Sequence, residues 1–361
     1  MVASCSYAAR RFGVRSAMPM ARALRLCPQM MVISSRHTEY GRVSNQVMER
    51  LARLTPLVEQ ISIDEAFMDI SDMPQDGAAV AHQIQAEIRS GLGLPCSLGV
   101  ATNKLVSKIA TDVGKAANRS EAPPNAITVV PPGTEADFLA PLPVDRLWGV
   151  GPVTAARLEE LGVTTIGDLA RYAEAELKSI FGKNGAELSQ HARGIDDRPV
   201  VTSHEIKSIS QETTFSRDVH SEEILLRTLA GLSESVARRL RQDKLAGSTV
   251  KIKLRWQDFT TLTRQVTLAQ PTDQDSQIFG AAAQLFSKVW EKGRPVRLLG
   301  VGVIGLCPTS RQLSLWDQES DREHRLHAAI DAIHDKFGEN VLHRGRQVKS
   351  HMGGKPTNGE I

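Results

Sequence analysis

Cysteines are few and scattered in this sequence: four occur in 361 residues, at Cys5, Cys27, Cys96 and Cys307. Because no Cys-x-x-Cys pair is present, the spacing argues against a zinc knuckle and against a disulfide framework. No stretch approaches the roughly 20 apolar residues that a membrane-spanning helix needs, and the N-terminus has no signal-peptide pattern. We therefore expect a cytoplasmic protein with reduced thiols and no contact with a membrane.

A strong excess of charge is also missing, because 44 Lys and Arg stand against 41 Asp and Glu, a net charge of +3. Such a balance neither requires nor excludes nucleic acid as a partner, so the local distribution of charge matters more than the total. At one domain per roughly 150 residues, the length predicts two or three domains.

An acidic pair interrupts the apolar stretch 61–70, where Asp64 and Glu65 are flanked by Ile61, Ile63, Phe67, Met68 and Ile70. The pattern predicts two short strands that meet at a tight turn holding both acids. Adjacent carboxylates in an apolar hairpin repel each other and need open water or bound cations to stay ionised. The residues by themselves leave two interpretations open, a divalent-metal site and a solvated turn.

Three motifs, taken in order, resemble those of a known family. They are S-Y-x-A-R-R-F-G-V-R-S-A-M-P from Ser6, S-I-D-E-A-F-x-D-I from Ser62 and N-K-x-x-x-K-I-A-T-D from Asn103. From Val2 to about Trp316, the chain resembles the Y-family translesion DNA polymerases, specifically the bacterial DNA polymerase IV subfamily.

The resemblance implies an α+β multidomain fold with a right-hand polymerase palm and fingers, a helical helix-hairpin-helix thumb and an α+β little finger. We expect partial fingers at 1–36, the palm at 37–133, the thumb at 134–203, the little finger at 204–307, and a clamp-binding motif with a C-terminal helix and tail at 308–361. In the family, a further palm strand precedes the first motif and carries the first metal-binding Asp and the aromatic residue that excludes ribonucleotides. Neither has a counterpart in this sequence, so we expect an N-terminally truncated chain whose activity is impaired.

The implied activity is that of a DNA-directed DNA polymerase of low fidelity without proofreading, which adds dNTPs to a primer 3′-hydroxyl. Asp64 and Glu65 would be the catalytic ligands of two Mg²⁺ ions. Tyr7 and Arg10, three apart on one face of an expected helix, and Lys115, just past a helix expected over 104–113, would contact the triphosphate. Two further lysines of that helix, at 104 and 108, are expected to lie on its solvated rim.

Two segments are candidates for contacts with DNA. Gly149 and Gly151 lie in a helix, G-x-G turn, helix pattern, where backbone N–H groups can approach a phosphate. Lys251, Lys253 and Arg255 alternate along an expected strand at 249–256, so their side chains share one face of a sheet. The alternatives are an ordinary tight turn and a solvated sheet face.

The C-terminal part of the sequence contains a candidate binding motif and a candidate helix. The segment containing Gln312, Leu313, Leu315 and Trp316 resembles the peptide that binds the groove of the sliding clamp, its beta subunit. An amphipathic helix is expected over 322–337, with Leu326, Ile330, Ile333 and Phe337 facing inward and its histidines on the surface. The expected partners are primer-template DNA, dNTP and the sliding clamp, bound by a monomer. A second hypothesis is a non-catalytic, polymerase-like accessory protein that binds DNA and the clamp.

Overall fold

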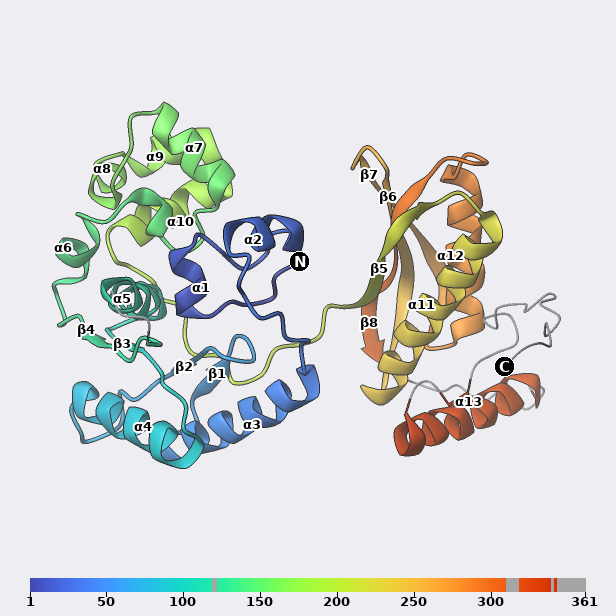
Figure 1. Cartoon of the computed structure of the whole chain (residues 1–361), viewed down its shortest axis with the longest axis horizontal. Helices are drawn as coiled ribbons and strands as arrows, with labels where there is room; N and C mark the ends of the chain where they lie inside the picture. Colours follow the sequence, from blue (N-terminus) through green and yellow to red (C-terminus); the bar gives the residue numbers. More distant parts are fainter. Residues whose placement is uncertain (119–121, 310–317, 339–340, 343–361) are drawn as a thin grey trace, which may run out of the picture. The chain divides into compact units, whose positions relative to one another are not determined.

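The computed structural model describes residues 1–118, 122–309, 318–338 and 341–342. They form two compact units that divide between His204 and Glu205 (Figure 1). The first unit contains α1 (Tyr7–Arg11), α2 (Met20–Leu26), α3 (His37–Leu54), β1 (Val58–Gln60), β2 (Ala66–Met68), α4 (Gly77–Leu92), β3 (Leu98–Val100), α5 (Lys104–Ala117), β4 (Ile127–Val129), α6 (Glu135–Leu139), the 3-10 turn η1 (Val144–Arg146), α7 (Pro152–Glu160), α8 (Ile166–Ala170), α9 (Glu174–Phe181) and α10 (Lys183–Ala192). The second contains β5 (Ser208–Val219), α11 (Glu222–Gln242), β6 (Leu245–Trp256), β7 (Thr261–Thr272), α12 (Asp275–Val289), β8 (Val296–Pro308) and α13 (Gln318–Phe337).

The strands of the first unit form two small sheets. β1 pairs antiparallel with β2, and β3 pairs parallel with β4, but no ladder joins the two pairs. The described strands of this unit therefore form two separate sheets. Apolar side chains of α3 and α4, including Leu51, Val80, Ile84 and Ile88, cover the first pair. A cavity lined by both β2 and β3 lies where a continuous sheet would need hydrogen bonds.

Helix α5 supports β3 and β4 and begins as the sequence predicted. The Asn103 side chain accepts a hydrogen bond from the Val106 N–H, which caps the first turn. The helix continues to Ala117, so the prediction that Lys115 lies just past it is wrong. Gly114 does not end the helix because it packs on β4, where an added Cβ would lie 2.5 Å from the Thr128 hydroxyl. Lys115 is therefore held at a helical position.

The segment 134–203 is built from short helices around an apolar core that includes Leu158, Ile166, Leu169 and Leu177. The prediction of a helix before the G-x-G turn is only partly right, because η1 is a single 3-10 turn. Helices α9 and α10 were not predicted. They are joined at Gly182, whose φ of +62° favours glycine.

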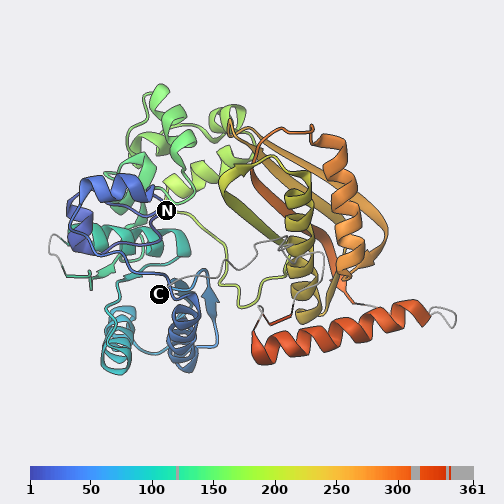
Figure 2. The ribbon, with the colours of Figure 1, turned by 45° about the vertical axis from the view of Figure 1, so that its right-hand side comes forward.

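The second unit is a four-stranded antiparallel sheet in the order β5-β8-β6-β7. Figures 1 and 2 agree that α11 and α12 lie side by side on one face of this sheet. Their buried side chains, such as Leu229 and Phe286, pack on Ile252, Leu254 and Val301 of the strands. The opposite face of the sheet carries the polar side chains that alternate along β6.

Helix α13 packs differently from the sequence prediction. Leu326, Ile333 and Phe337 are exposed, whereas His327 and His334 are buried. The expected inward face and the expected surface position of these two histidines are therefore wrong. The reason is that polar contacts hold the helix against α11 and α12. Arg241 Nε of α11 lies 2.7 Å from Asp331 Oδ2, and His327 Nε2 lies 2.9 Å from an oxygen of Asp275 in α12.

Candidate functional site

The acidic pair lies in a closed turn between β1 and β2. The backbone N–H groups of Ile61 and Ser62 both donate to the Glu65 carbonyl oxygen, at 2.9 and 3.2 Å. These bonds end β1 at Gln60, so Ile61 and Ile63 belong to the turn and are exposed, contrary to the prediction that they lie in the strands. The Ser62 hydroxyl donates to Asp64 Oδ1 at 2.6 Å, which orients that carboxylate. Both acids therefore lie in the turn, outside the backbone hydrogen bonds that pair β1 with β2.

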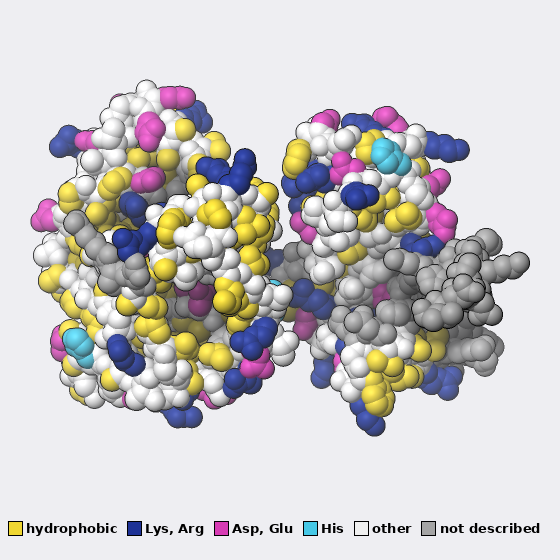
Figure 3. Space-filling view, viewed as in Figure 1, with side chains coloured by type: hydrophobic (Ala, Val, Ile, Leu, Met, Phe, Trp, Pro, Cys, Tyr) yellow, Lys and Arg dark blue, Asp and Glu magenta, His cyan; other side chains and the backbone are white. Residues whose placement is uncertain are grey.

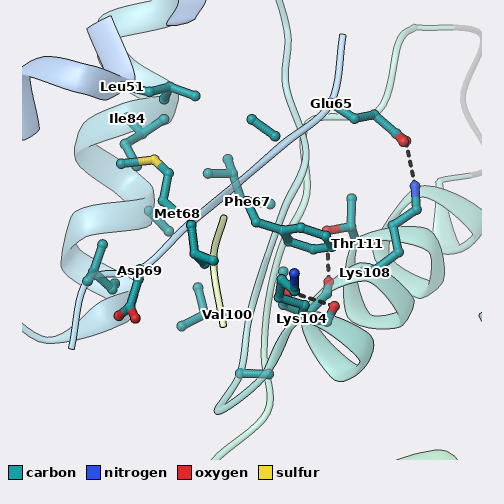
Figure 4. A pocket seen from close by; sticks show the side chains of 18 of the residues that line it. Leu51, Glu65, Phe67, Met68, Asp69, Ile84, Val100, Lys104, Lys108 and Thr111 are labelled. Atoms are coloured by element: carbon teal, nitrogen blue, oxygen red, sulfur yellow. Dashed lines mark hydrogen bonds and ion pairs between the residues drawn. The ribbon is translucent and has the colours of Figure 1, made fainter. Parts of the chain in front are cut away.

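A cavity of about 540 Å³ opens beside this turn and is lined by Asp64, Glu65, β2, β3, and parts of α3, α4 and α5. The face of the first unit drawn in Figure 3 is hollowed, with acidic side chains inside the hollow and Lys or Arg side chains on its rim. One end of the cavity holds the apolar side chains of Leu51, Ile84 and Met68 together with Asp69 (Figure 4). The other end holds Glu65 and Lys108, which form an ion pair, and is called the ionic end.

Three lysines of α5 line the cavity at the ionic end. Lys108 Nζ donates to Glu65 Oε1 at 2.5 Å, and Lys115 Nζ lies 4.0 Å from the same oxygen (Figure 4 shows the first pair). Lys104 Nζ donates to the buried Glu59 at 2.8 Å. The sequence interpretation of Lys104 and Lys108 as a solvated rim is wrong. The signal in the sequence was their spacing of four residues, which places both lysines on one face of the helix, with Lys115 about two turns beyond Lys108.

A third carboxylate, Asp69, also lines the cavity. Hydrogen bonds from the Ser71 side chain and backbone lower its pKa, so it is ionised at neutral pH. It follows Glu65 by four strand residues, a path of about 13 Å at the usual rise, and Figure 4 shows the two at opposite ends of the cavity. Among the described residues, no group of three His, Cys, Asp or Glu side chains could hold a metal ion. The Asp64–Glu65 pair therefore remains the candidate for cations.

Tyr7 and Arg10 lie together on α1, as their spacing predicted. The Arg10 guanidinium carbon stacks 4.5 Å from the centre of the Tyr7 ring. Arg10 Nε is buried and has no hydrogen-bond partner within the described part of the chain. Neither residue is among those that line the cavity, whereas Lys115 is. The structure thus groups Asp64, Glu65 and Lys115, and separately pairs Tyr7 with Arg10.

The glycine turn before α7 leaves its backbone open. Gly149 has a φ of +98°, and Gly151 is the N-cap residue of α7. An added Cβ at either glycine would have no atom within 4 Å. The turn is therefore open around both glycines, and the first residue of α7, Pro152, has no N–H.

On β6, Lys251, Lys253 and Arg255 alternate with the buried Ile252, Leu254 and Trp256. Lys253 Nζ bonds a Glu212 oxygen at 2.9 Å, and Arg255 Nε donates to the Thr261 hydroxyl at 2.9 Å. Gly302 and Gly300 on β8 face Lys251 and Lys253 in register. Because these glycines carry no side chain, the lysine stems lie close to the sheet: a Cβ added at Gly302 would be 3.7 Å from Lys251 Cε, and one added at Gly300 would be 3.5 Å from Lys253 Cβ. The basic stripe thus runs along β6, with Glu212 of β5 paired to its middle residue.

Three other predictions concern the chain more broadly. Gln312, Leu313, Leu315 and Trp316, the expected clamp-binding residues, lie outside the described residues. The four cysteines are free thiols. Within the described ranges, no helix is both long and apolar enough to span a membrane.

Comparisons with known proteins agree with this architecture. The impB/mucB/samB family matches residues 1–112, its C-terminal domain matches residues 206–315, and the thumb domain of DNA polymerase iota matches residues 145–196. DNA polymerase IV of Desulfatibacillum aliphaticivorans is 42% identical over 95% of this chain and 86% of its own length. DNA polymerase IV of Bacillus velezensis is 35% identical over 97% of this chain and 84% of its own length.

Solved structures give the same result. A Y-family polymerase chimera of Dbh and Dpo4 is 25% identical, with a TM-score of 0.73 over 84% of this chain and 86% of that one. An insertion ternary complex of Dbh DNA polymerase is 25% identical, with a TM-score of 0.57 over the same shares. The fold is therefore that of a polymerase with a palm, a helix-hairpin-helix thumb and a little finger. The chain belongs to the Y-family DNA polymerases, which are DNA-directed, and its curated relatives carry the name DNA polymerase IV.

Proposed function

We propose that this chain transfers deoxynucleotides to a primer 3′-hydroxyl as a translesion polymerase of low fidelity without proofreading. The observation that carries the proposal is the ionic end of the cavity, where Asp64 and Glu65 lie with Lys108 and Lys115. Carboxylates suit cations and ammonium groups suit phosphates, so this end matches a metal-bound polyphosphate. Primer-template DNA and dNTP are the proposed substrates. Two of the solved structures that are similar to this chain are ternary complexes of Dbh, which supports this choice.

The acidic pair also fits the implied metal. Mg²⁺ takes hard oxygen ligands and is usually held by one or two carboxylates together with substrate phosphates. Asp64 and Glu65 supply two such carboxylates on one turn, and we propose that they hold two Mg²⁺ ions. When bound, these ions would lower the pKa of the attacking hydroxyl and neutralise the leaving pyrophosphate.

The remaining side chains position the substrates. Lys115 would bind the triphosphate from α5, and Arg10 would bind it from α1 beside Tyr7. Placement and charge of this kind are the main contributions a protein makes to phosphoryl transfer. Gly149 and Gly151 would offer backbone N–H groups to a DNA phosphate.

Further from the cavity, Lys251, Lys253 and Arg255 would follow the backbone of the duplex. We also propose that Gln312, Leu313, Leu315 and Trp316 bind the sliding clamp, and that the protein acts in the cytoplasm as a monomer. Replacing Leu315 with Ala is expected to abolish capture by the immobilised clamp and to leave binding to primer-template DNA unchanged.

Primer extension with Mg²⁺ tests the central proposal. Asp64→Asn and Glu65→Gln are each expected to reduce single-nucleotide incorporation by about 100-fold or more, as loss of a preorganised electrostatic group does. Glu39→Gln is the control, because Glu39 lies in an exposed ion pair with Arg42. DNA binding, followed by fluorescence anisotropy, is expected to persist in all variants. Unchanged incorporation by both cavity variants would contradict the proposal.

One further outcome has a defined meaning. For the accessory hypothesis, the decisive observation is damage tolerance in cells that persists with Asp64→Ala but is lost with Leu315→Ala.

A further inference from the structure

Lys108 is the closest cation to the acidic turn among the described residues. Its Nζ lies 2.5 Å from Glu65 Oε1 and 3.8 Å from Asp112 Oδ1. The Lys108 side chain is 18% exposed and that of Glu65 is 34% exposed, so water screens their contact only in part. The ammonium group thus already pairs with a Glu65 oxygen that a metal ion would need as a ligand.

The surroundings favour this pairing. Asp64 is the immediate neighbour of Glu65, and its Oδ1 is already held by the Ser62 hydroxyl. Two adjacent carboxylates at one turn repel each other, and the Lys108 charge offsets that repulsion. Lys115 Nζ lies 4.0 Å from the same Glu65 oxygen, so a second ammonium group is close to this carboxylate.

We propose that Lys108 is the resident counter-cation of Glu65 and makes the binding of a divalent cation depend on the nucleotide. In the absence of a triphosphate, a cation that binds Glu65 through Oε1 has to displace the ammonium group. A triphosphate supplies several anionic oxygens, which accept hydrogen bonds from Lys108 and Lys115 and release Glu65 for the cation. This inference rests on the proposed function, since it assigns a coupling role within the same site.

The inference can be tested by binding, without turnover. Mn²⁺ is titrated into the full chain and the free ion is followed by electron paramagnetic resonance, with and without a non-hydrolysable α,β-imido deoxynucleoside triphosphate. The wild type is expected to bind Mn²⁺ weakly alone and much more tightly with the nucleotide analogue. Lys108→Met is expected to bind Mn²⁺ alone at least about tenfold more tightly than the wild type, with a smaller gain from the analogue. A tenfold change corresponds to about 1.4 kcal/mol.

Two controls separate this effect from others. Lys178→Met removes the same charge from an exposed position on α9 and is expected to leave both affinities unchanged. Lys108→Arg keeps a positive charge beside Glu65 and is expected to restore weak binding of Mn²⁺ alone. Thermal unfolding of each variant verifies that it is folded.

The outcomes distinguish the inference from the proposed function. If Lys108→Met binds Mn²⁺ alone no more tightly than the wild type, while Asp64→Asn and Glu65→Gln lose the nucleotide-dependent binding, the coupling role is wrong and the metal site stands. If Asp64→Asn and Glu65→Gln bind Mn²⁺ with the analogue as well as the wild type does, the metal site itself is wrong.

Discussion

Replacing Glu59 with Gln should destabilise the first unit, because this carboxylate joins segments that are distant in sequence. Glu59 Oε2 accepts hydrogen bonds from Lys104 Nζ at 2.8 Å and from the Val201 N–H at 2.9 Å. His204 Nε2 lies 3.5 Å from its other oxygen. The side chains of Glu59 and Lys104 are each only 11% exposed. The backbone at Val201 is thereby tied to β1 and α5.

The magnitude follows from burial. Removing one partner of a buried ion pair costs about 3–5 kcal/mol because the other charge stays buried without compensation. Gln keeps an oxygen that can accept from the Val201 N–H, so we expect a loss of about 2–3 kcal/mol in the free energy of unfolding. For a unit of this size, that corresponds to a decrease of about 5–10 °C in the melting temperature.

The effect should also depend on pH. Burial raises the pKa of Glu59, but the hydrogen bonds from Lys104 and Val201 and the charges of Lys104 and His204 outweigh it, so the pKa lies below its ordinary value of 4.5. A carboxyl group whose pKa is lower in the folded state contributes stability above its unfolded pKa and loses it as the pH falls through its folded pKa. The difference between the wild type and Glu59→Gln is therefore expected at pH 7 and should shrink below about pH 4.

Urea unfolding followed by circular dichroism is the assay. Glu39→Gln is the matched control, because Glu39 and Arg42 are 50% and 58% exposed and such pairs contribute about 0–1 kcal/mol. Glu59→Gln combined with Lys104→Met should lose less stability than the two single variants added together. A loss for Glu59→Gln no larger than that of Glu39→Gln would refute the reasoning.

Three further predictions use the same assay or DNA binding. Gly99→Ala should lower the free energy of unfolding by more than about 3 kcal/mol, because the added Cβ would lie 2.0 Å from the Ser107 carbonyl oxygen. Gly151→Ala is the control and should fold normally, since the space around Gly151 is open. Equal stability of the two variants would contradict this prediction. Phe259→Gly should stabilise the second unit by about 1 kcal/mol, because Phe259 is exposed and its φ of +65° strains any residue other than glycine. A lower stability of this variant would contradict the presence of backbone strain at this position. Lys251→Ala should reduce the slope of log K against log salt for DNA binding by about 0.9, and an unchanged slope would remove Lys251 from the DNA interface.

Features that depend on near neighbours were predicted well. The structure shows the start of α5 at Lys104, the pairing of Tyr7 with Arg10 and the common face of Lys251, Lys253 and Arg255. All three follow from patterns of a few residues. Such contacts are formed within one turn or one strand, so the local pattern is enough to specify them.

Helix α13 shows where local pattern fails. Its apolar spacing predicted that Leu326 and Phe337 face inward, but both are exposed. Ion pairs with Arg238 and Arg241 of α11 decide the orientation instead. Periodicity identifies the two faces of a helix, and only the partner surface decides which of them is buried.

The amino-acid sequence by itself determined the family, the acidic turn and the helical and strand periods, because each is a property of residues close together in the chain. Only the tertiary structure decided that Lys108 faces Glu65, that Glu59 meets Lys104 and the Val201 backbone across 45 and 142 residues, and that β2 and β3 remain in separate sheets. These contacts depend on where the chain returns after long excursions, and the free energy of packing the whole unit sets those paths.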